Sequence, residues 1–293
     1  MADTPLLQAS PEVLTRAVER NLFDLFRAMA SALPGGELEE KGNICRHSTF
    51  PSNPMFKGAW HPRLTPDTVD GAIEETVAWF QARRAPYFFW WTGPESAPGD
   101  LSARLTRRGF ISMEEQSKVL AKGIVQGAAG APCMISDLAG MNEAVMTRTP
   151  AGFSIESVRD ETTLSEFKRV FVETYSIPDW AGQAWVDATL RIGIGRTPWR
   201  MYLGRLDGAP VATSMLFLGG GIASVYAVAS TPAARGKNIG GAITLKPLLE
   251  ARSEGYRYAG LFSSEMGVRT YLNIGFRMTE GRINRFLWRA PGD

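Results

Sequence analysis

Residues 230–245 read STPAARGKNIGGAITL and follow a β-branched, apolar run, ASVYAVA at 223–229. Three glycines in this stretch need a reason, because glycine loses more backbone entropy on folding than any other residue. The stretch is either an ordinary strand-to-helix turn or a cradle for a phosphorylated ligand. Its spacing alone favours neither interpretation.

A phosphate cradle at this position would rest on backbone amides. Successive N–H groups in a glycine-containing turn bind anions, and the first turn of the following helix adds unpaired amides and a positive dipole end. Gly236, Gly240 and Gly241 would let a diphosphate approach the main chain, while Arg235 and Lys237 would supply charge. Neither a G-x-x-x-x-G-K-[ST] nor a G-x-G-x-x-G motif occurs in this stretch.

Length and composition limit the classes to which the protein can belong. A chain of 293 residues, 44% hydrophobic and 21% charged, is long enough for two compact units with cores of their own. A net charge of +2 does not indicate nucleic acid as the main partner. Between Arg235 and Asp293, however, ten Lys/Arg accompany five Asp/Glu, which suits a small anionic ligand or a solvated cationic face equally well.

The cysteines and the apolar segments indicate a compartment. Cys45 and Cys133 form no closely spaced pair, which is typical of a reducing environment rather than a disulfide scaffold. The segment MADTPLLQASPEV has no basic region followed by an apolar core, and no apolar run reaches membrane-spanning length. We therefore expect a soluble, cytoplasmic monomer or homodimer without a membrane or nucleic-acid partner.

The N-terminal half alternates helices with short strands. Helical periodicity predicts a helix from Pro11 to Ala32 that stops at Pro34-Gly35-Gly36, and a second helix over 65–85. Strands are expected at 42–50, 55–63, 86–94 and 111–123, a helix at 98–110, and a linker or surface loop at 123–132.

The C-terminal half follows the order β–α–α–β–β–β–α–β–α–β. Asp207-Gly208 predicts a hairpin between two strands of this half. Pro247 lies inside the helix that follows the glycine stretch, where it removes one hydrogen bond and predicts a kink. The other expected elements are strands at 152–160, 221–230, 258–265 and 276–289, the last one a strand or hairpin, and helices at 163–176, 180–192 and 268–275.

Two motifs resemble those of a known family. VYAVASTPAARGKNIGGAI (225–243) looks like motif A of the GNAT superfamily of N-acetyltransferases, whose loop reads [QR]-x-x-G-x-[GA]. Arg235 matches the leading cation and Gly240 the closing glycine. Asn238 replaces the first glycine, a mild change, because Asn tolerates left-handed geometry and can cap a helix. The family's second signature places a tyrosine before Gly-Phe and is matched by Tyr271, Gly275 and Phe276.

The resemblance covers about residues 152–288 and implies a fold class. We expect an α+β protein with two GNAT-like domains, each a mixed, mostly antiparallel sheet flanked by helices. The N-terminal half resembles the degenerate first half of tandem GNAT proteins and has no counterpart of RGKNIGG, so we expect no cofactor site there. The expected boundaries are 1–132 for the first domain, 133–151 for a linker and 152–293 for the acetyl-CoA-binding domain.

The same resemblance implies transfer of an acetyl group from acetyl-CoA, or of another acyl group from its acyl-CoA, to an amine. Main-chain groups of the strand would pair with the pantetheine arm, and loop amides would hold the pyrophosphate. Ser264 stands where the family often has an asparagine. The residues predicted to bind the cofactor are Val228, Ala229, Arg235, Gly236, Lys237, Asn238, Ile239, Gly240 and Ser264.

By the same resemblance, Tyr271 would protonate the departing thiolate. A phenol with an ordinary pKa of about 10 stays protonated beside a thiol with a pKa of about 8.5. No general base stands out, because a surface or capping role explains each candidate carboxylate equally well. The side chains considered for the base are Tyr226, Glu173, Asp179 and Glu265. His47 and His61 lack metal-ligand spacing, so no metal is expected.

Three functions fit these residues. The first is acetylation of a small-molecule or amino-acid-like amine by direct attack on the thioester. The second is a catalytically weak CoA-binding or interaction module, which Asn238 and Ser264 permit. The third is acetylation of a peptide or protein terminus, because acceptor choice depends on pocket shape rather than on either motif.

Overall fold

The computed structural model describes residues 3–50, 56–113, 130–196 and 198–291 and divides into two compact units. The C-terminal unit consists of Met1–Leu25 and Cys133–Thr279, and the N-terminal unit of Phe26–Pro132 and Glu280–Asp293. Each unit combines helices with a sheet of mixed strand directions, so the expected α+β class is confirmed. The predicted surface loop at 123–132 lies almost wholly outside the described residues.

The sheet of the C-terminal unit runs in the order β6, β11, β10, β9, β8, β7. All neighbouring strands pair antiparallel except β10 and β11, which run parallel. The predicted hairpin is confirmed: Leu206 pairs with Ala209 across Asp207 and Gly208, which both have positive φ. The strands are β6 (Ala131–Asp137), β7 (Phe153–Ser157), β8 (Trp199–Leu206), β9 (Ala209–Gly219), β10 (Ile222–Ser230) and β11 (Tyr258–Phe262).

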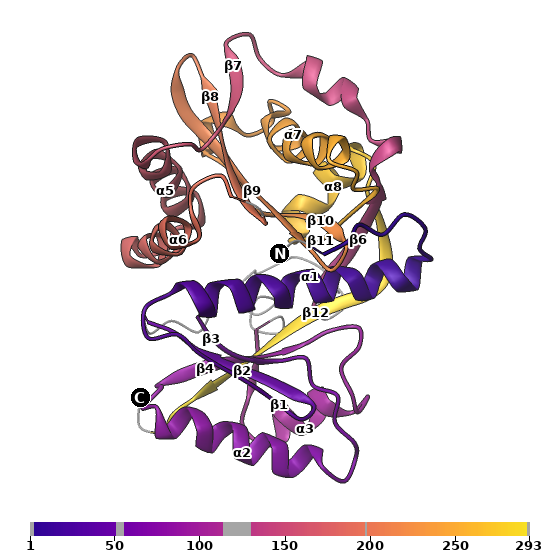
Figure 1. Ribbon diagram of the computed structural model, residues 1–293, viewed down its shortest axis with the longest axis vertical. Coiled ribbons are helices and arrows are strands. Elements are labelled where there is room, and N and C mark those ends of the chain that lie inside the picture. Colours follow the sequence, from indigo (N-terminus) through magenta and orange to yellow (C-terminus); the bar gives the residue numbers. More distant parts are fainter. Residues whose placement is uncertain (1–2, 51–55, 114–129, 197, 292–293) are drawn as a thin grey trace, which may run out of the picture. The chain divides into compact units, whose positions relative to one another are not determined.

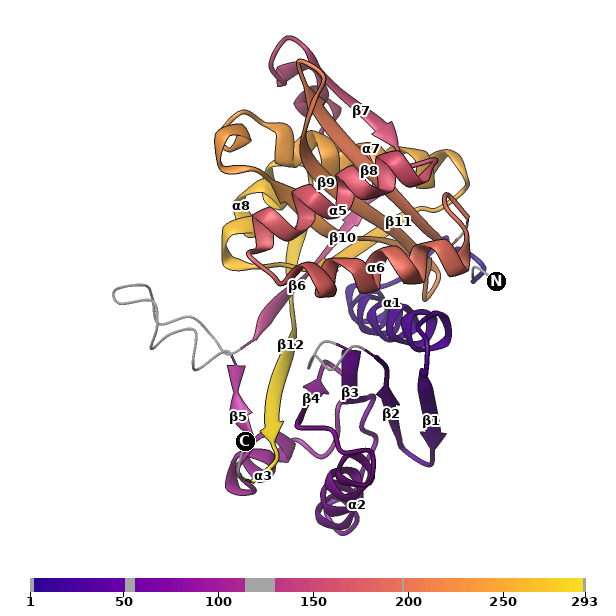
Figure 2. The same ribbon diagram turned by 90° about the vertical axis from the view of Figure 1, so that its left-hand side faces the viewer.

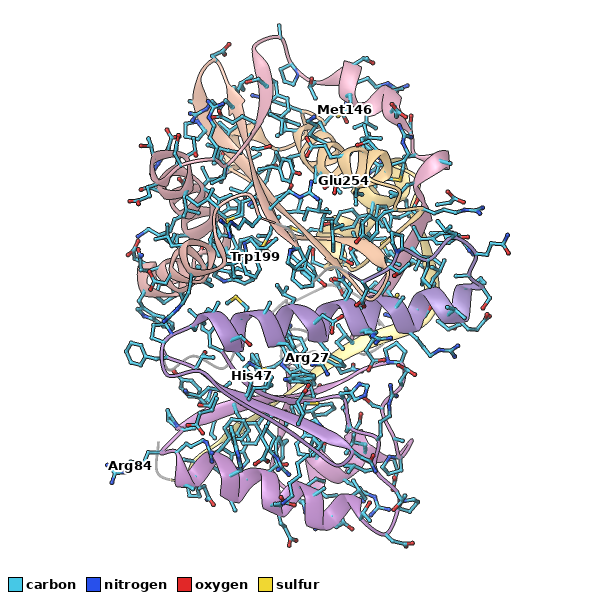
Figure 3. All side chains as sticks on the ribbon, viewed as in Figure 1. Arg27, His47, Arg84, Met146, Trp199 and Glu254 are labelled. Carbon is cyan, nitrogen blue, oxygen red and sulfur yellow. The ribbon has the colours of Figure 1, made fainter. Side chains whose placement is uncertain are left out.

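Helices cover both faces of this sheet (Figure 1). On one face lie α5 (Glu161–Tyr175) and α6 (Asp179–Ile192), and on the other lie α7 (Ile239–Ser253) and α8 (Glu265–Asn273). The start of α5 is set by a capping box, in which the Asp160 carboxylate accepts a hydrogen bond from the Thr163 amide at 2.8 Å. Trp199, labelled in Figure 3, is fully buried and its ring contacts Trp185 of α6.

The N-terminal unit has a sheet of its own. β1 (Glu37–Lys41), β2 (Ile44–Ser48) and β3 (Lys57–Trp60) pair antiparallel, and β4 (Tyr87–Thr92) then runs parallel to β3. Two helices, α2 (Val69–Ala82) and α3 (Leu101–Arg107), pack on one face of it (Figure 2). Phe80 and Leu105 from these helices share a buried core with Phe88, Trp90 and Trp288. The short strand β5 (Ile111–Ser112) pairs with β12 (Arg277–Arg289).

The unit boundaries differ from those expected from the sequence. Residues 133–151, expected as a linker, form most of β6 and the 3₁₀ segments η2 (Leu138–Gly140) and η3 (Glu143–Arg148). The last strand, β12, pairs with β4 of the N-terminal unit through Asn284–Arg289, whereas Cys133–Asp137 pair with β11 of the C-terminal unit. A strand belongs to the unit that contains the strand with which it pairs. The local sequence of a strand does not predict which strand that is.

Helix α1 (Pro11–Ala32) begins in the C-terminal unit. Its buried Asn21 donates through Nδ2 to the carbonyls of Phe217, Gly219 and Ile222, at 2.9 to 3.4 Å. These carbonyls surround the tight β9–β10 connection, so Asn21 ties the first residues of the chain to that hairpin.

Pro247 does not interrupt α7, which continues from Ile239 to Ser253. A proline at this position leaves the carbonyl of Ile243, four residues earlier, without its helical donor. The buried Ser214 of β9 supplies the missing donor, because its hydroxyl donates to the Ile243 carbonyl at 2.7 Å. A side chain from the sheet thus makes the proline tolerable in a buried helix.

Candidate functional site

A cavity of about 870 Å³ lies in the C-terminal unit where β10 ends and α7 begins. The main chain and small side chains contribute much of its wall. From β10 and the following loop come Val228, Ala229, Ser230, Ala234, Arg235, Gly236 and Asn238, and from α7 Gly240 and Gly241. The rest of the lining is Val145, Thr174, Tyr175, Ser264, Met266, Arg269, Thr270, Asn273 and Ile274.

The cavity opens where two parallel strands separate. β10 and β11 are in register only at Ala223–Ser224 and Ala259–Gly260. Beyond these residues β10 remains paired with β9 on its other side, and a bulge between Tyr226 and Ala229 shifts that register. A bulge bends its strand and redirects its main-chain groups. The end of β10 therefore presents main-chain groups that β11 does not use.

The loop between β10 and α7 is shaped by two left-handed residues. Gly236 has φ of 73° and Asn238 has φ of 59°. The expectation that Asn238 tolerates this geometry is confirmed, but it does not cap α7 with its side chain. Its amide group donates instead to the carbonyl of Arg148 at 3.2 Å, which fixes the loop against η3.

The start of α7 leaves a run of amides without acceptors. Among the described residues, no oxygen accepts a hydrogen bond from the N–H groups of Gly236 to Gly241, and the first helical bond is from Ala242 to the Asn238 carbonyl. The first turn of α7 contains no acidic residue. Unpaired amides at a helix N-terminus, together with the helix dipole, form an anion-binding site.

Two cations border these amides. Arg235 and Arg269 both line the cavity, and among the described residues neither forms an ion pair. Lys237 is exposed but is not part of the lining. The wall thus combines free N–H donors with two guanidinium groups, a set that suits phosphate oxygens.

The structure brings most of the predicted cofactor-binding residues together. Seven of the nine line the cavity: Val228, Ala229, Arg235, Gly236, Asn238, Gly240 and Ser264. Ile239 is fully buried in the core beneath α7, so only its main chain is available to a ligand. The Ser264 hydroxyl accepts from the Gly267 amide at 3.3 Å and so caps α8.

Tyr271 does not line the cavity, although its neighbour Thr270 on α8 does. Its half-buried ring packs against Phe276, with ring centroids 5.8 Å apart. Desolvation raises the pKa of Tyr271 well above its ordinary value, and the nearby Tyr175 adds to this effect. The phenol therefore stays protonated at neutral pH.

Tyr175, which was not among the predicted site residues, reaches the cavity from the last turn of α5. Its hydroxyl donates to the carbonyl of Val228 at 3.0 Å, within the bulge of β10. Desolvation raises the pKa of Tyr175 to about 12. Helical periodicity places Tyr175 four residues after Phe171, whose ring it contacts, but no sequence signal connects it to a strand 53 residues away.

The candidate bases lie away from the cavity wall. The Tyr226 hydroxyl donates to Oδ1 of Asn21 at 2.7 Å, and Asp179 forms an ion pair with Lys168 at 2.9 Å. None of the four side chains considered for this role lines the cavity: Tyr226, Glu173, Asp179 and Glu265.

Other kinds of site find no support in the described part of the chain. No group of three or more His, Cys, Asp or Glu residues there is placed to hold a metal ion. His47 is buried in the N-terminal unit near Arg27 (Figure 3), and its Nδ1 accepts from the Trp60 indole at 2.9 Å. Among the same residues, no helix combines the length and apolar character needed to cross a bilayer.

Comparisons with known proteins identify the fold. No protein-family model and no curated protein sequence matches the chain. Solved structures do match: a GCN5-related N-acetyltransferase from Kribbella flavida has a TM-score of 0.66 at 16% identity, over 92% of this chain and 95% of that one. A GCN5-related N-acetyltransferase from Sphaerobacter thermophilus has a TM-score of 0.61 at 14% identity, over 100% and 96% of the two chains.

A third match extends the likeness to both units. A tandem GNAT protein from the clavulanic acid biosynthesis pathway has a TM-score of 0.58 at 13% identity, over 99% of each chain. The chain therefore has the GNAT fold. It has this fold in the tandem form, with both units included in the match.

Proposed function

We propose that this chain transfers the acetyl group of acetyl-CoA, or a related acyl group, to an amine. One observation carries the proposal: the unpaired amides of Gly236 to Gly241 lie at the cavity wall next to the unused edge of β10. A diphosphate and an extended amide-containing arm are the two features of CoA that such a surface would bind.

The loop and the first turn of α7 would hold the pyrophosphate. Gly236 and Gly240 present N–H groups with no side chain in the way, and a Cβ on Gly236 would meet nothing within 4 Å. Arg235 and Arg269 would add charge-assisted hydrogen bonds at the rim. Ile239 would contribute its amide only.

The end of β10 would bind the pantetheine arm. An extended chain with amide groups can add to a strand edge as another strand would, through main-chain hydrogen bonds. Val228 and Ala229 supply such groups at the cavity wall, where the Val228 carbonyl also accepts from the Tyr175 hydroxyl, and β10 has no described strand pairing with β11 after Ser224. The arm would then lead from the pyrophosphate toward the bulge, where the thioester would lie.

Besides binding CoA, the reaction requires only that protons be removed from the amine and supplied to the thiolate. A neutral amine attacks the thioester carbonyl, and the departing thiolate takes up a proton. Two phenols lie near the bulge end of the cavity: Tyr271, which the sequence motif predicts as the donor, and Tyr175. Among the described residues, the cavity wall has no carboxylate or histidine side chain, so deprotonation of the amine would proceed through solvent.

The acceptor that we propose is a small-molecule or amino-acid-like amine. A weak CoA-binding module and a peptide or protein acceptor remain the alternatives. The amides at the loop support CoA binding for all three candidate functions, so only a measurement of turnover distinguishes these functions.

Isothermal calorimetry with acetyl-CoA, followed by an amine screen that records thiol release, tests the proposal. Binding and turnover of small amines would support it. Absence of binding at high micromolar acetyl-CoA would refute it. Binding without turnover across small amines and peptides would favour the CoA-binding module.

A further inference from the structure

The bulge of β10 is approached by a phenol that belongs to a different element from the predicted donor. Tyr175 is the last residue of α5, and the next residue, Ser176, ends the helix in the left-handed conformation with φ of 50°. The Tyr175 ring is fixed by its contact with Phe171, at 4.9 Å between ring centroids. Its hydroxyl therefore has a defined position at the cavity wall, 3.0 Å from the Val228 carbonyl.

Tyr271 is placed differently. It packs its ring on Phe276 and over Gly267, where an added Cβ would lie 2.7 Å from the tyrosine ring. It is absent from the cavity lining, whereas Tyr175 is part of it and keeps 47% of its surface exposed. Of the two phenols, Tyr175 is the one that a molecule in the cavity can touch.

We infer that Tyr175 is a catalytic residue that donates its hydroxyl proton to the sulfur of CoA, an inference that rests on the proposed function. A thiolate is a stronger acceptor than the Val228 carbonyl, because hydrogen bonds to a charged partner are about twice as strong as neutral ones. The hydroxyl would turn from the carbonyl to the sulfur as negative charge develops there.

The proton that Tyr175 donates is returned to it within one reaction cycle. The amine nitrogen forms a bond to the acyl carbon, the C–S bond breaks, and its electron pair remains on sulfur. The Tyr175 proton passes to that sulfur, and the phenolate regains a proton from the new amide's nitrogen through water at the exposed side of the ring. Tyr271 would then act on the site through Tyr175, as a neighbouring phenol.

The test needs no acceptor, because it measures the affinity of CoA itself. CoA and an analogue lacking the sulfur atom are titrated calorimetrically at pH 7 and pH 9, which span the ordinary thiol pKa of about 8.5. The analogue has the same phosphates and the same arm, so the ratio of the two affinities isolates the sulfur. Tyr271 interacts electrostatically with Tyr175, Arg235 and Arg269 line the same cavity, and Glu173 lies on the same helix; the effects of these groups on the phosphates cancel in this ratio.

In the native protein the preference for CoA over the analogue should grow roughly tenfold between pH 7 and pH 9, because the thiolate gains a charge-assisted hydrogen bond. Tyr175→Phe keeps the ring contact with Phe171 and should remove this gain. Tyr271→Phe should retain it. Thermal unfolding of both variants verifies that each is folded.

Three results would overturn the inference. The growth of the preference for CoA between pH 7 and pH 9 could persist in Tyr175→Phe, or it could vanish only in Tyr271→Phe. The native protein could also show no such growth. Failure of the native protein to bind either compound would instead refute the proposed function, so the two failures are distinguishable.

Discussion

Both units contain a strand, an eight-residue connection and a helix, and they use the start of that helix in opposite ways. The connections span 61–68 before α2 and 231–238 before α7. In each case the strand runs parallel to its next neighbour over two residue pairs only. The pairs are Gly58 with Phe89 and Ala59 with Trp90 in one unit, and Ala223 with Ala259 and Ser224 with Gly260 in the other.

In the N-terminal unit the chain itself satisfies several amides before and at the start of α2, whereas among the described residues those of Asp67, Asp70 and Gly71 have no acceptor. Arg63 donates to the Asn43 carbonyl at 2.7 Å, Leu64 to the Ala97 carbonyl at 3.2 Å, and Thr65 to the Thr68 hydroxyl at 3.0 Å. The first turn of α2 also has an acidic residue, Asp70, which would repel an anion. In the C-terminal unit the amides of Ala234 and Arg235 are also satisfied within the chain, but those of Gly236 to Gly241 have no acceptor among the described residues, and the first turn of α7 has no acid.

The difference teaches that the same succession of strand, connection and helix can present different amides and charges at the start of the helix, so a shared fold does not by itself make an anion site. Gly236, Gly240 and Gly241 keep side chains away from the amides of one loop, whereas threonines and a proline fold the other loop back on itself. The absence of a cofactor site in the N-terminal half stays a prediction. The two loops also provide matched pairs of variants.

The largest effect is expected from Gly240→Val. A Cβ at Gly240 would meet only ordinary contacts, Ser230 Oγ at 3.8 Å and Thr270 Cγ2 at 4.0 Å, so the protein should fold. The valine would instead fill the cavity beside the amides and lower CoA affinity by about 100-fold or more, a loss of roughly 3 kcal/mol. Calorimetry measures this change.

Gly71→Val is the matched control, because Gly71 stands near the start of α2 and its Cβ would meet nothing within 4 Å. Its CoA affinity should equal that of the native protein. Equal losses in both variants would mean that CoA does not bind at the α7 loop.

A pH effect on stability through histidine is expected in the N-terminal unit, which contains both histidines of the chain. Desolvation in the fully buried site, reinforced by Lys57, lowers the pKa of His47 to about 3, whereas the ordinary value is about 6.5. The unfolded chain thus binds a proton between these values that the folded chain does not. The stability contribution is complete above pH 6.5 and is lost as the pH falls toward 3.

Between pH 7 and pH 5 the free energy of unfolding of this unit should fall by about 2 kcal/mol on account of His47. His47→Gln retains an acceptor for the Trp60 indole and should reduce the pH dependence, leaving the part due to His61, whose pKa burial and nearby arginines also lower. Hydrogen exchange of β2 and β3 amides at the two pH values provides the measurement. An equal pH dependence in the variant would show that another group is responsible.

Arg235→Ala should weaken CoA binding about tenfold at low salt and less at high salt, because a charge-assisted contact at a solvent-exposed rim is screened. Arg63→Ala is its counterpart in the other connection, where Arg63 is paired with Glu95 at 2.5 Å. That control should bind CoA normally. A salt-independent loss in Arg235→Ala would point to altered loop structure rather than to lost charge.

The smallest effect concerns the helices that follow the two loops, since α7 contains a proline and α2 does not. Ser214→Ala should destabilise the protein by about 1 kcal/mol, because the buried Ile243 carbonyl loses its donor. In a Pro247→Ala background the helix supplies that donor, and the same change should cost little. Urea denaturation of the four proteins measures the coupling, and additive effects would contradict the assignment.

Much of the fold and of the candidate site could be predicted from local pattern. The Asp207-Gly208 hairpin and the helix beginning at the glycine stretch follow from turn chemistry that acts within a few residues. The loop amides, Val228 and Ala229 were predicted from the resemblance to the family's motif A, since turn chemistry alone did not distinguish a turn from an anion cradle. The assignment of Tyr271 as proton donor stays a prediction, while Lys237 was included for its charge and lies outside the cavity wall.

By itself, therefore, the sequence determined most of the helices and strands and their order, and it marked the glycine loop as a candidate anion site, because glycine, capping and turn preferences act locally. Only the tertiary structure decided that β12 and the segment 133–137 join different units. It also decided that Ser214 satisfies the carbonyl freed by Pro247, and that Tyr175 reaches Val228 across 53 residues. These contacts join residues far apart in the chain, and their geometry is set by how sheet and helices pack rather than by any neighbouring residue.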